Sequence, residues 1–369
     1  MKYFAILLLL TVSGLTKAQT TRKTENIFII TLDGFRWQEL FSGADSALIQ
    51  NKTYTHDSLE MRSLFWMDSP EERRKKLMPF FWKTLASEGQ LYGNRKFNNN
   101  VNCSNTMWFS YPGYSEILCG FADDERITSN NKIDNPNITV LEFLNKNQRY
   151  KGKVAAFASW DVIPYVVNEK RSGVFVNGGY ELATGKNLSE REIFLNDLQP
   201  RIPGHWGSVR QDAFTHYYAM EYLKKHQPKV LYISYGETDD FAHDGRYDQY
   251  LKSAYRTDQF IQELWQWAQS QPAYKNKTTF LITTDHGRGT VPIETWKNHG
   301  DEILGADQIW LAVIGPDTPP LGEQKVAGQL YQNQVAQTAA TFLGVAYTNE
   351  KKVGDAIGTA SRIKLPVGR

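Results

Sequence analysis

Five short runs of apolar and β-branched residues recur along the chain, and each ends abruptly in polar residues. They are IFIITLDG (27–34), KVAAFASWD (153–161), KVLYISYGETDD (229–240), TTFLITTDHG (278–287) and QIWLAVIGP (308–316). The apolar residues are continuous rather than alternating with polar ones. The pattern therefore predicts strands buried on both faces, as in a parallel sheet that is covered by helices.

Longer stretches with helical periodicity lie between these runs, at 209–226, 247–269 and 335–343. Strands that alternate with helices predict a layered α/β/α fold with a central, mostly parallel sheet and right-handed crossovers. Two segments, about 41–100 and 161–207, fit this alternation poorly and are rich in aromatic residues, Asn and Gly. We expect them to form loops or a cap over the carboxyl edge of the sheet, where open α/β sheets bind ligands.

Residues 1–18 have the pattern of a signal peptide. Lys2 precedes a short apolar run, and Thr16-Lys17-Ala18 suits cleavage before Gln19. The run is too short to span a hydrocarbon core of about 30 Å. We therefore expect export to the periplasm or the exterior, no stable membrane anchor, and a single catalytic domain over residues 19–369.

Composition narrows the possible partners. Residues 1–18 contain two lysines and no acidic residue, so their removal leaves equal numbers of basic and acidic residues. This balance gives no electrostatic case for a nucleic-acid-binding surface or for an acidic membrane surface. An exported chain can form disulfides, and Cys103 and Cys119 are its two cysteines. A bridge between them and two buried thiols both remain open.

Carboxylates and histidines gather at the ends of the predicted strands. They are Asp33, Asp239, His243, Asp285 and His286, and His299 follows in KNHGDE. The chain has only seven histidines, so three of them in this set is a strong concentration. Imidazole nitrogen and carboxylate oxygen together suit zinc and similar ions. Six candidates suffice for two divalent ions with three protein ligands and an open position each.

Three hydroxyls in NTMWFSYPGYSEILCG (105–120) are candidate nucleophiles. Pro112 and Gly120 predict a helix at about 112–119. Ser110 then lies at its N-terminal entrance, where an anion meets unpaired N–H groups and the positive end of the helix dipole. Ser115 would lie inside the helix, bonded back to the backbone or facing solvent, and Thr106 lies farther out in the loop. Position therefore favours Ser110.

Together these residues resemble the alkaline phosphatase superfamily, and within it the type I phosphodiesterase/nucleotide pyrophosphatase branch. The motifs that carry the resemblance are LDGFR (32–36), SYPGYSEILCG (110–120), ETDDFAH (237–243), TDHG (284–287) and NHGDE (298–302). The nucleophile motif of this branch has its hydroxyl ten residues before a Gly and two before a Pro, and Ser110 matches both spacings. The resemblance extends in order over most of the chain.

The resemblance implies two ligand sets and a phosphate contact. One ion would be held by Asp33, Asp285 and His286, with Ser110 bridging toward it. The second would be held by Asp239, His243 and His299. An asparagine in ITSNNKID (127–134) would bind a phosphoryl oxygen, with Asn130 the better match and Asn131 the next.

The implied activity is hydrolysis of a small-molecule phosphoester through a covalent phosphoseryl intermediate on Ser110. The cofactors would be two divalent ions, with zinc favoured and manganese or iron also compatible. A neutral asparagine contact suits a singly charged diester, which puts a phosphodiesterase ahead of a phosphomonoesterase. A monoesterase would need further cations, for which Lys132 and Arg36 are candidates, although solvent-facing positions or structural ion pairs are equal interpretations.

Several departures from the family pattern leave the subfamily open. Thr238 stands in place of a proline, Gly113-Tyr114 in place of Asn-His, and the nucleophile is Ser rather than Thr. Sulfatases need an Arg at the position of Tyr114, which disfavours a sulfatase. A catalytically silent exported binding protein is the non-enzyme alternative. Such a protein should have lost a ligand or the nucleophile, and all seven positions are filled.

Overall fold

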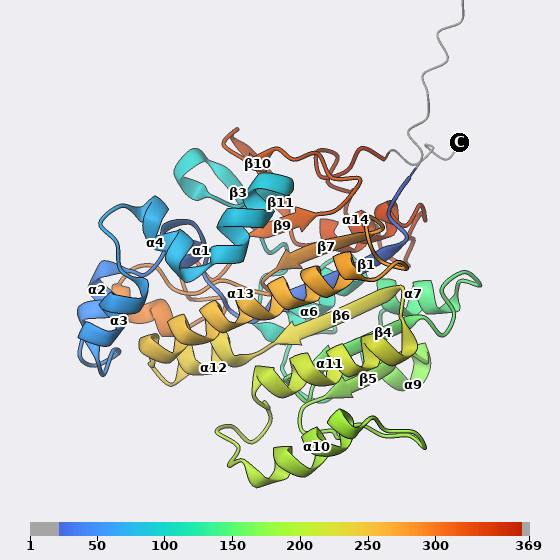
Figure 1. Ribbon diagram of the computed structural model, residues 1–369. Helices are drawn as coiled ribbons and strands as arrows, with labels where there is room; N and C mark the ends of the chain where they lie inside the picture. Colours follow the sequence, from blue (N-terminus) through green and yellow to red (C-terminus); the bar gives the residue numbers. More distant parts are fainter. Residues whose placement is uncertain (1–21, 364–369) are drawn as a thin grey trace, which may run out of the picture.

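The computed structural model describes residues 22–363 (Figure 1). The signal peptide expected at residues 1–18 lies outside the described part of the chain. Within residues 22–363, no helix combines the length and the apolar character needed to cross a membrane.

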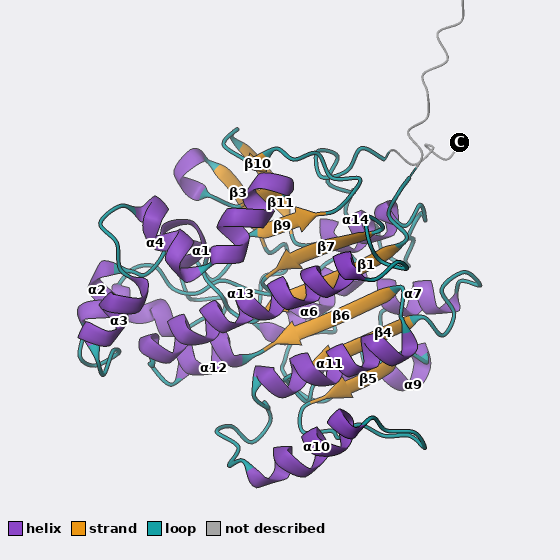
Figure 2. Ribbon diagram, viewed as in Figure 1, coloured by secondary structure: helices purple, strands orange, loops and turns teal. Residues whose placement is uncertain are grey.

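An eight-stranded sheet forms the centre of the described fold, with the strand order β10-β2-β9-β7-β1-β6-β4-β5 (Figure 2). Its strands are β1 (Asn26–Leu32), β2 (Gln90–Tyr92), β4 (Val154–Ala158), β5 (Phe175–Gly178), β6 (Val230–Tyr235), β7 (Thr278–Thr283), β9 (Leu311–Ile314) and β10 (Gly322–Glu323). All pairings are parallel except those of β9 with β7 and β2. The expected mostly parallel sheet is confirmed.

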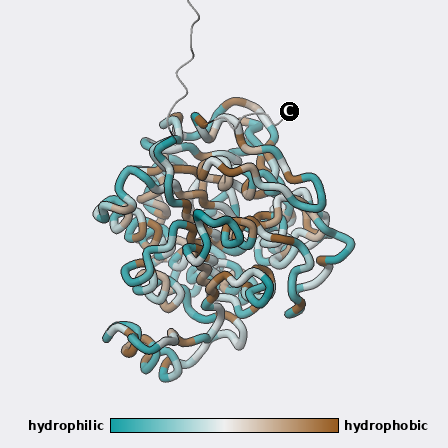
Figure 3. The backbone as a smooth tube through the Cα atoms, turned by 90° about the vertical axis from the view of Figure 1, so that its right-hand side faces the viewer, coloured by the Kyte–Doolittle hydropathy of each residue, from teal (hydrophilic) through white to brown (hydrophobic). Residues whose placement is uncertain are grey.

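Helices cover both faces of this sheet (Figure 1). One face carries α1 (Trp37–Ser42), α4 (Pro70–Leu77), α11 (Asp212–His226) and α13 (Tyr247–Ser270). The other carries α6 (Ser110–Cys119), α7 (Val140–Lys146), α8 (Ile163–Val167) and α14 (Gln334–Phe342). Strand residues alternate between the two cores: Phe28 and Ile30 pack on one side, Ile27 and Ile29 on the other. Burial on both faces explains the continuous apolar runs, and Figure 3 shows the hydrophobic residues gathered in the interior.

The remaining elements are short. The helices are α2 (Ser46–Gln50), α3 (Ser58–Phe65), α5 (Ala86–Glu88), α9 (Glu169–Ser172), α10 (Glu190–Leu198) and α12 (Glu237–His243). Four helical turns are η1 (Phe81–Leu85), η2 (Arg95–Phe97), η3 (Gln199–Arg201) and η4 (Ile293–Lys297). A second sheet has the order β11-β3-β8 and consists of β3 (Asn99–Asn102), β8 (Gln308–Ile309) and β11 (Gly328–Tyr331).

The run at 308–316 differs from the expected parallel strand. It divides into β8 and β9, which belong to different sheets, and β9 runs antiparallel to β7. The connection from β7 contains η4 but no α-helix. Parallel neighbours need a crossover, usually helical, whereas a chain that returns directly pairs in the opposite direction.

The two segments expected as loops or a cap also contribute to the core. Segment 41–100 contains β2, and segment 161–207 contains β5, the last strand of the main sheet. Their sequences, QLY and FVNG, are too short and mixed for a periodicity to be recognised. Most of the remaining residues in these segments lie in helices and helical turns, among them α2 to α4 in the first segment and α10 in the second (Figure 1).

Three adjacent parallel strands place the site. Thr31 of β1 pairs with Ser234 of β6 and with Thr283 of β7, so the carboxyl ends of these strands are level. The N–H of Asp33 continues the pairing and donates to the carbonyl of Tyr235 at 2.9 Å. Side chains that follow these strands therefore emerge at one edge of the sheet.

Candidate active site

Six carboxylates and histidines meet at the carboxyl ends of β1, β6 and β7. They are Asp33 after β1, Asp239 and His243 in α12 directly after β6, Asp285 and His286 after β7, and His299 after η4. The six side chains form two groups of three, and within each group the ligand atoms lie within 4.8 Å of one another. Open α/β sheets bind ligands at this edge.

The two groups differ in burial. Asp33, Asp285 and His286 are buried and are called the buried group below. Asp239, His243 and His299 form the open group, in which the His243 side chain is 46% exposed. The groups are adjacent, because the rings of His286 and His299 have centroids 4.0 Å apart.

The donor atoms of the buried group fit a divalent cation. His286 Nδ1 donates to the carbonyl of Gly287 at 2.8 Å, so Nε2 is the nitrogen left for a second proton or for a cation. This Nε2 lies 3.3 Å from Asp33 Oδ1 and 3.5 Å from Asp285 Oδ2. Both of these carboxylate oxygens are buried and have no hydrogen-bond partner among the described residues. A lone pair facing buried carboxylate oxygens requires a proton or a cation between them.

The open group also fits a cation. His243 Nε2 lies 3.1 Å from Asp239 Oδ2 and 2.9 Å from His299 Nε2. Two imidazole nitrogens at this distance, next to a carboxylate, either share a proton or bind one ion together. Two histidines and one aspartate are a donor set typical of zinc sites.

The electrostatics of the two groups follow from their crowding. Burial, and then the negative charge of neighbouring carboxylates, raises the pKa of Asp33 and of Asp285. Burial alone would lower the pKa of His286, but Asp285, Asp33 and Asp239 outweigh it and raise the pKa to about 9. For His299, burial followed by His286 lowers the pKa well below its usual value, which keeps the ring neutral as a ligand requires.

Of the three candidate nucleophiles in 105–120, Ser110 is the one that lies at these groups. Helix α6 begins at Ser110, two residues before the expected start. Ser110 is 5% exposed, and its Oγ lies 3.4 Å from His286 Nε2. Thr106 instead donates to Asp124 on the surface, at 2.9 Å.

Ser115 lies on a different side of α6. Its hydroxyl is buried, accepts a hydrogen bond from Asn135 Nδ2 at 3.1 Å and contacts Cys119 Sγ at 3.8 Å. The expectation that it bonds to the backbone or faces solvent is wrong, because the whole of α6 is buried. Cys103 and Cys119 are free buried thiols, which answers the open question of a bridge.

Two unusual residues of the nucleophile motif fit α6 against the ligands. A Cβ on Gly113 would lie 2.2 Å from the carbonyl oxygen of Asp285, so only glycine allows this approach. One residue later, the Tyr114 hydroxyl donates to Asp33 Oδ2 at 2.7 Å. From the sequence, Gly113-Tyr114 was recognised only as a departure from the family pattern. The contact of Tyr114 with a candidate ligand was not predicted.

Buried Glu116 fixes the loop that leads to Ser110. Its carboxylate accepts hydrogen bonds from the backbone N–H groups of Ser104 and Asn105 and from both of their side chains, at 2.6–3.1 Å. The loop also contacts the His299 segment, because the Trp108 carbonyl accepts from the Gly300 N–H at 3.0 Å.

Asn130 lies next to the first turn of α6. Its Oδ1 accepts from the Tyr111 N–H at 2.9 Å, a contact that does not use its two Nδ2–H donors. Asn130 and Asn131 are both exposed, and the backbone N–H of Asn131 donates to Ser129 Oγ at 3.3 Å. Of the two asparagines, Asn130 is therefore the one anchored beside Ser110.

The two cations considered for a monoester are engaged elsewhere. Lys132 pairs with Asp161 at 2.6 Å, and Arg36 is buried in an ion pair with Glu39. Neither contacts either ligand group. Thr238, the residue in place of the family proline, donates through Oγ1 to the carbonyl of Asp33 at 2.5 Å.

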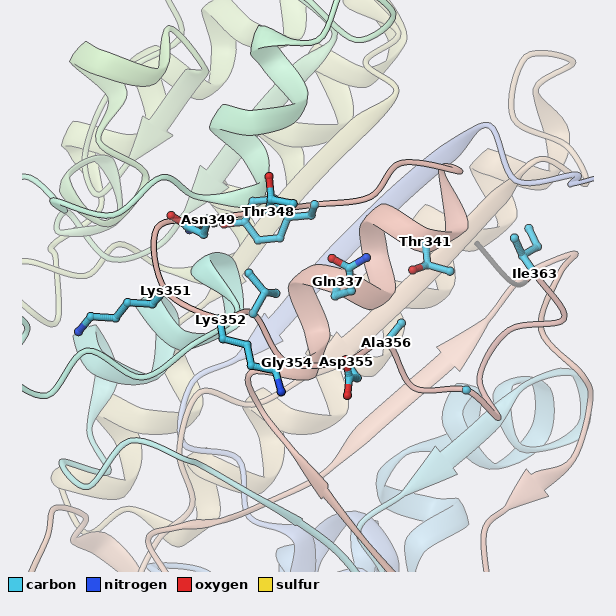
Figure 4. Close-up of a pocket in the computed structure, with 13 residues that line it drawn as sticks. Gln337, Thr341, Thr348, Asn349, Lys351, Lys352, Gly354, Asp355, Ala356 and Ile363 are labelled. Atoms are coloured by element: carbon cyan, nitrogen blue, oxygen red, sulfur yellow. Dashed lines mark hydrogen bonds between the residues drawn. The ribbon is translucent and has the colours of Figure 1, made fainter. Parts of the chain in front are cut away.

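A cavity of about 540 Å³ borders the Asn130 segment, and its lining includes Lys132, Asp161, Tyr165 and Tyr180. Another cavity of about 500 Å³ lies between α14 and the C-terminal segment, beside Gln337 and Lys352 (Figure 4). Ser110, Asn130 and the six candidate ligands line neither of these cavities, and the lining of the first begins at Lys132, two residues after Asn130.

Comparison with known proteins gave one family and several structural neighbours. The family described as "Type I phosphodiesterase / nucleotide pyrophosphatase" matches residues 46–342, which include every candidate site residue except Asp33. No curated protein sequence matches the chain.

The structural neighbours have an alkaline-phosphatase-like fold. Alkaline phosphatase PafA is 9% identical, with a TM-score of 0.58 over 92% of this chain and 99% of that one. A putative sulfatase from Bacteroides thetaiotaomicron is 11% identical, with 0.57 over 94% and 76%. Lipoteichoic acid synthase LtaP from Listeria monocytogenes is 14% identical, with 0.55 over 92% and 75%. These likenesses confirm the expected fold.

Gly113→Ala should destabilise the protein. The added Cβ would collide with the Asp285 backbone, and overpacking of this kind costs about 1–3 kcal/mol. Urea unfolding measures the loss, and Gly358→Ala, whose Cβ meets nothing within 4 Å, serves as the control. Equal stability of the two variants would contradict the close packing of α6 on the Asp285 segment.

Binding of a divalent ion should release at least one proton at pH 7. With its pKa at about 9, His286 carries a proton there in the ion-free protein, and a cation needs the same Nε2 lone pair. Affinity should therefore fall as the pH decreases below about 9. Calorimetric titration of zinc in buffers of different ionisation enthalpy measures the protons released; a binding heat that is independent of the buffer would contradict the expectation.

Proposed function

The chain belongs to the type I phosphodiesterase/nucleotide pyrophosphatase family of phosphoester hydrolases, and from this premise we propose that it hydrolyses small-molecule phosphodiesters through a phosphoseryl intermediate on Ser110. The observation that carries the proposal is the position of Ser110, at the start of α6 and 3.4 Å from His286 of the buried group. The buried and the open group would each hold one divalent ion, with zinc favoured by three histidines and three carboxylates.

Ser110 is the nucleophile in this proposal. When bound, two divalent ions supply positive charge opposite the phosphoryl oxygens and lower the pKa of the serine hydroxyl. Ser110 Oγ attacks phosphorus in line, the first ester oxygen departs, and the proton lost by Ser110 balances the alcohol released. Water then cleaves the phosphoseryl ester, which restores Ser110 and releases a phosphomonoester.

Backbone and side-chain donors face the reacting phosphate. The Ser110 N–H lies at the start of α6, at the positive end of the helix dipole. The next N–H, that of Tyr111, is taken by Asn130, and Pro112 has none. Asn130 would add a neutral hydrogen-bond donor from Nδ2, since its oxygen is held by Tyr111. Donors that are already in place stabilise charge on the equatorial oxygens without reorganisation.

The distribution of cations supports a diester over a monoester. A monoester carries one more negative charge and needs an additional cation. Lys132 and Arg36 are both engaged in ion pairs away from the ligand groups. The neutral Asn130 suits the single charge of a diester.

The cavity beside Asn130 would hold the second ester group of a diester. Its lining carries the carboxylates of Asp134, Asp161, Glu169 and Glu181 and the ammonium groups of Lys132 and Lys170. Both lysines pair with aspartates, and the two glutamates have no basic partner among residues 22–363. A further phosphate in this cavity would be repelled. We therefore favour diesters of uncharged or ammonium-bearing alcohols over polyphosphates.

Export remains part of the proposal. The pattern of residues 1–18 supports a cleaved signal peptide, with Gln19 as the new N-terminus, and a mature enzyme in the periplasm or outside the cell. N-terminal sequencing of the mature protein tests this, and an intact Met1 would contradict it.

Ser110→Ala should abolish hydrolysis, with a loss of roughly 10³-fold or more in kcat, because it removes the nucleophile. The substrates are methyl para-nitrophenyl phosphate, para-nitrophenyl phosphate and para-nitrophenyl sulfate, which share a leaving group. We expect the diester to be preferred, and Ser115→Ala to be nearly as active as the natural chain. Activity that survives Ser110→Ala would exclude this serine, and a monoester preference would favour the phosphomonoesterase.

The Glu169→Gln/Glu181→Gln double variant should lose part of its discrimination against substrates with additional phosphates. We expect a several-fold rise in kcat/KM for a nucleoside triphosphate, because two negative charges leave the cavity, and no change for methyl para-nitrophenyl phosphate. Glu190→Gln, an exposed residue of α10 outside the cavity, is the control. An unchanged preference would exclude the cavity as the second ester site.

A further inference from the structure

Arg288 is a buried arginine beside the open group to which no motif assigns a role. It follows Asp285 by three residues and is 1% exposed. Its Nε donates to the carbonyl of Gly34 at 3.1 Å, and Nη1 donates to the carbonyl of Lys297 at 2.6 Å. Its Nη2 contacts Asp239 twice, at the carbonyl oxygen at 3.1 Å and at Oδ1 of the carboxylate.

These contacts join three segments that carry candidate ligands. Gly34 directly follows Asp33, and Lys297 ends η4 two residues before His299. The guanidinium is planar and presents its donors in a fixed fork, so it sets the relative position of all three segments at once. A lysine ammonium cannot reach three acceptors with this geometry.

The open group depends on Arg288 more than the buried group does. In the buried group, Asp33 Oδ2 accepts from Tyr114 and Asp285 Oδ1 accepts from the Gly34 N–H at 3.0 Å. In the open group, the described contacts of the Asp239 carboxylate are with histidines and with Arg288. The guanidinium occupies Oδ1, while Oδ2 faces His243 at 3.1 Å.

We propose that Arg288 is a positioning residue that holds Asp239 and the His299 segment in ion-binding geometry and thereby sets the affinity of the open group for its ion. The inference rests on the proposed function, in which each group binds one ion. Residues that orient metal ligands through hydrogen bonds typically change metal affinity by about 10–100-fold when they are replaced.

The test measures zinc bound per chain across a series of buffered free zinc concentrations, by mass spectrometry of the metal. We expect two ions in the natural protein. In Arg288→Gln one ion should bind as before, and the affinity for the other should fall by about 10–100-fold. Arg288→Lys keeps the positive charge but not the planar fork of donors. Its affinity for the second ion should lie between those of the natural protein and of Arg288→Gln.

Arg74→Gln is the matched control. Arg74 is also largely buried, and it makes a two-point ion pair with Glu323 and a contact with the Phe41 carbonyl. Its loss removes a comparable ion pair away from both groups. We expect both zinc affinities to be unchanged in this variant.

The outcomes separate this inference from the proposed function. Fewer than two ions in the natural chain would contradict the two-ion proposal and this inference with it. Two ions with unchanged affinities in Arg288→Gln, or an equal weakening of both, would overturn the role of Arg288 alone. Circular dichroism checks folding. If Arg288→Gln fails to fold, zinc binding is measured in Arg288→Lys instead. An unchanged affinity of that variant for the second ion would overturn the proposal.

Discussion

The structure depends on how three carboxylates and three imidazoles are held together at one edge of a sheet. His286 Nε2 faces carboxylate oxygens of Asp33, Asp239 and Asp285 at 3.3–3.5 Å, and two of these oxygens have no hydrogen-bond partner among the described residues. Such crowding costs free energy unless positive charge lies between the oxygens. The raised pKa values of Asp33 and Asp285 reflect this cost. Folding and cation binding are therefore linked: a divalent ion that binds here also stabilises the fold.

Glycine residues hold the six side chains together, because they let backbone segments lie close to the candidate ligands. Gly34 has a positive φ of 55°, and a Cβ there would lie 2.7 Å from Asp239 Oδ1 and 2.8 Å from Arg288 Nε. Gly113 allows α6 to contact the Asp285 backbone, which brings Ser110 to the ligands. Level strand ends, two glycines and the buried Glu116 thus fix a serine against two ligand groups, and rigid support of this kind is what a reactive site requires.

The elements that the sequence predicts well are those with long, simple patterns. Strands β1, β6 and β7 are buried on both faces, so their apolar runs are recognisable, and the six candidate ligands follow them in short motifs. Strands β2 and β5 are too short to show a period, and the direction of β9 depends on the missing crossover, which a hydropathy pattern does not encode. Tyr114 and Arg288 were not predicted because their roles depend on the segments opposite them. The sequence shows an arginine directly after the TDHG motif, but it does not show that the arginine is buried or that Asp239, Gly34 and Lys297 are its partners.

Charge balance connects the site with its proposed substrate. When the three imidazoles are neutral, as metal binding requires, the three carboxylates and the Arg288 guanidinium leave two net negative charges. Asp240 adds no charge at neutral pH, because burial and then Asp239 raise its pKa to about 9.

Two divalent ions would turn this balance into two net positive charges, and the Ser110 alkoxide would cancel one of them. The remaining charge matches a singly charged diester. A doubly charged monoester would exceed it, and Lys132, the nearest cation of the Asn130 segment, already neutralises Asp161. Arg288 therefore bears on substrate charge as well as on ligand geometry, because without it the balance would no longer match a diester.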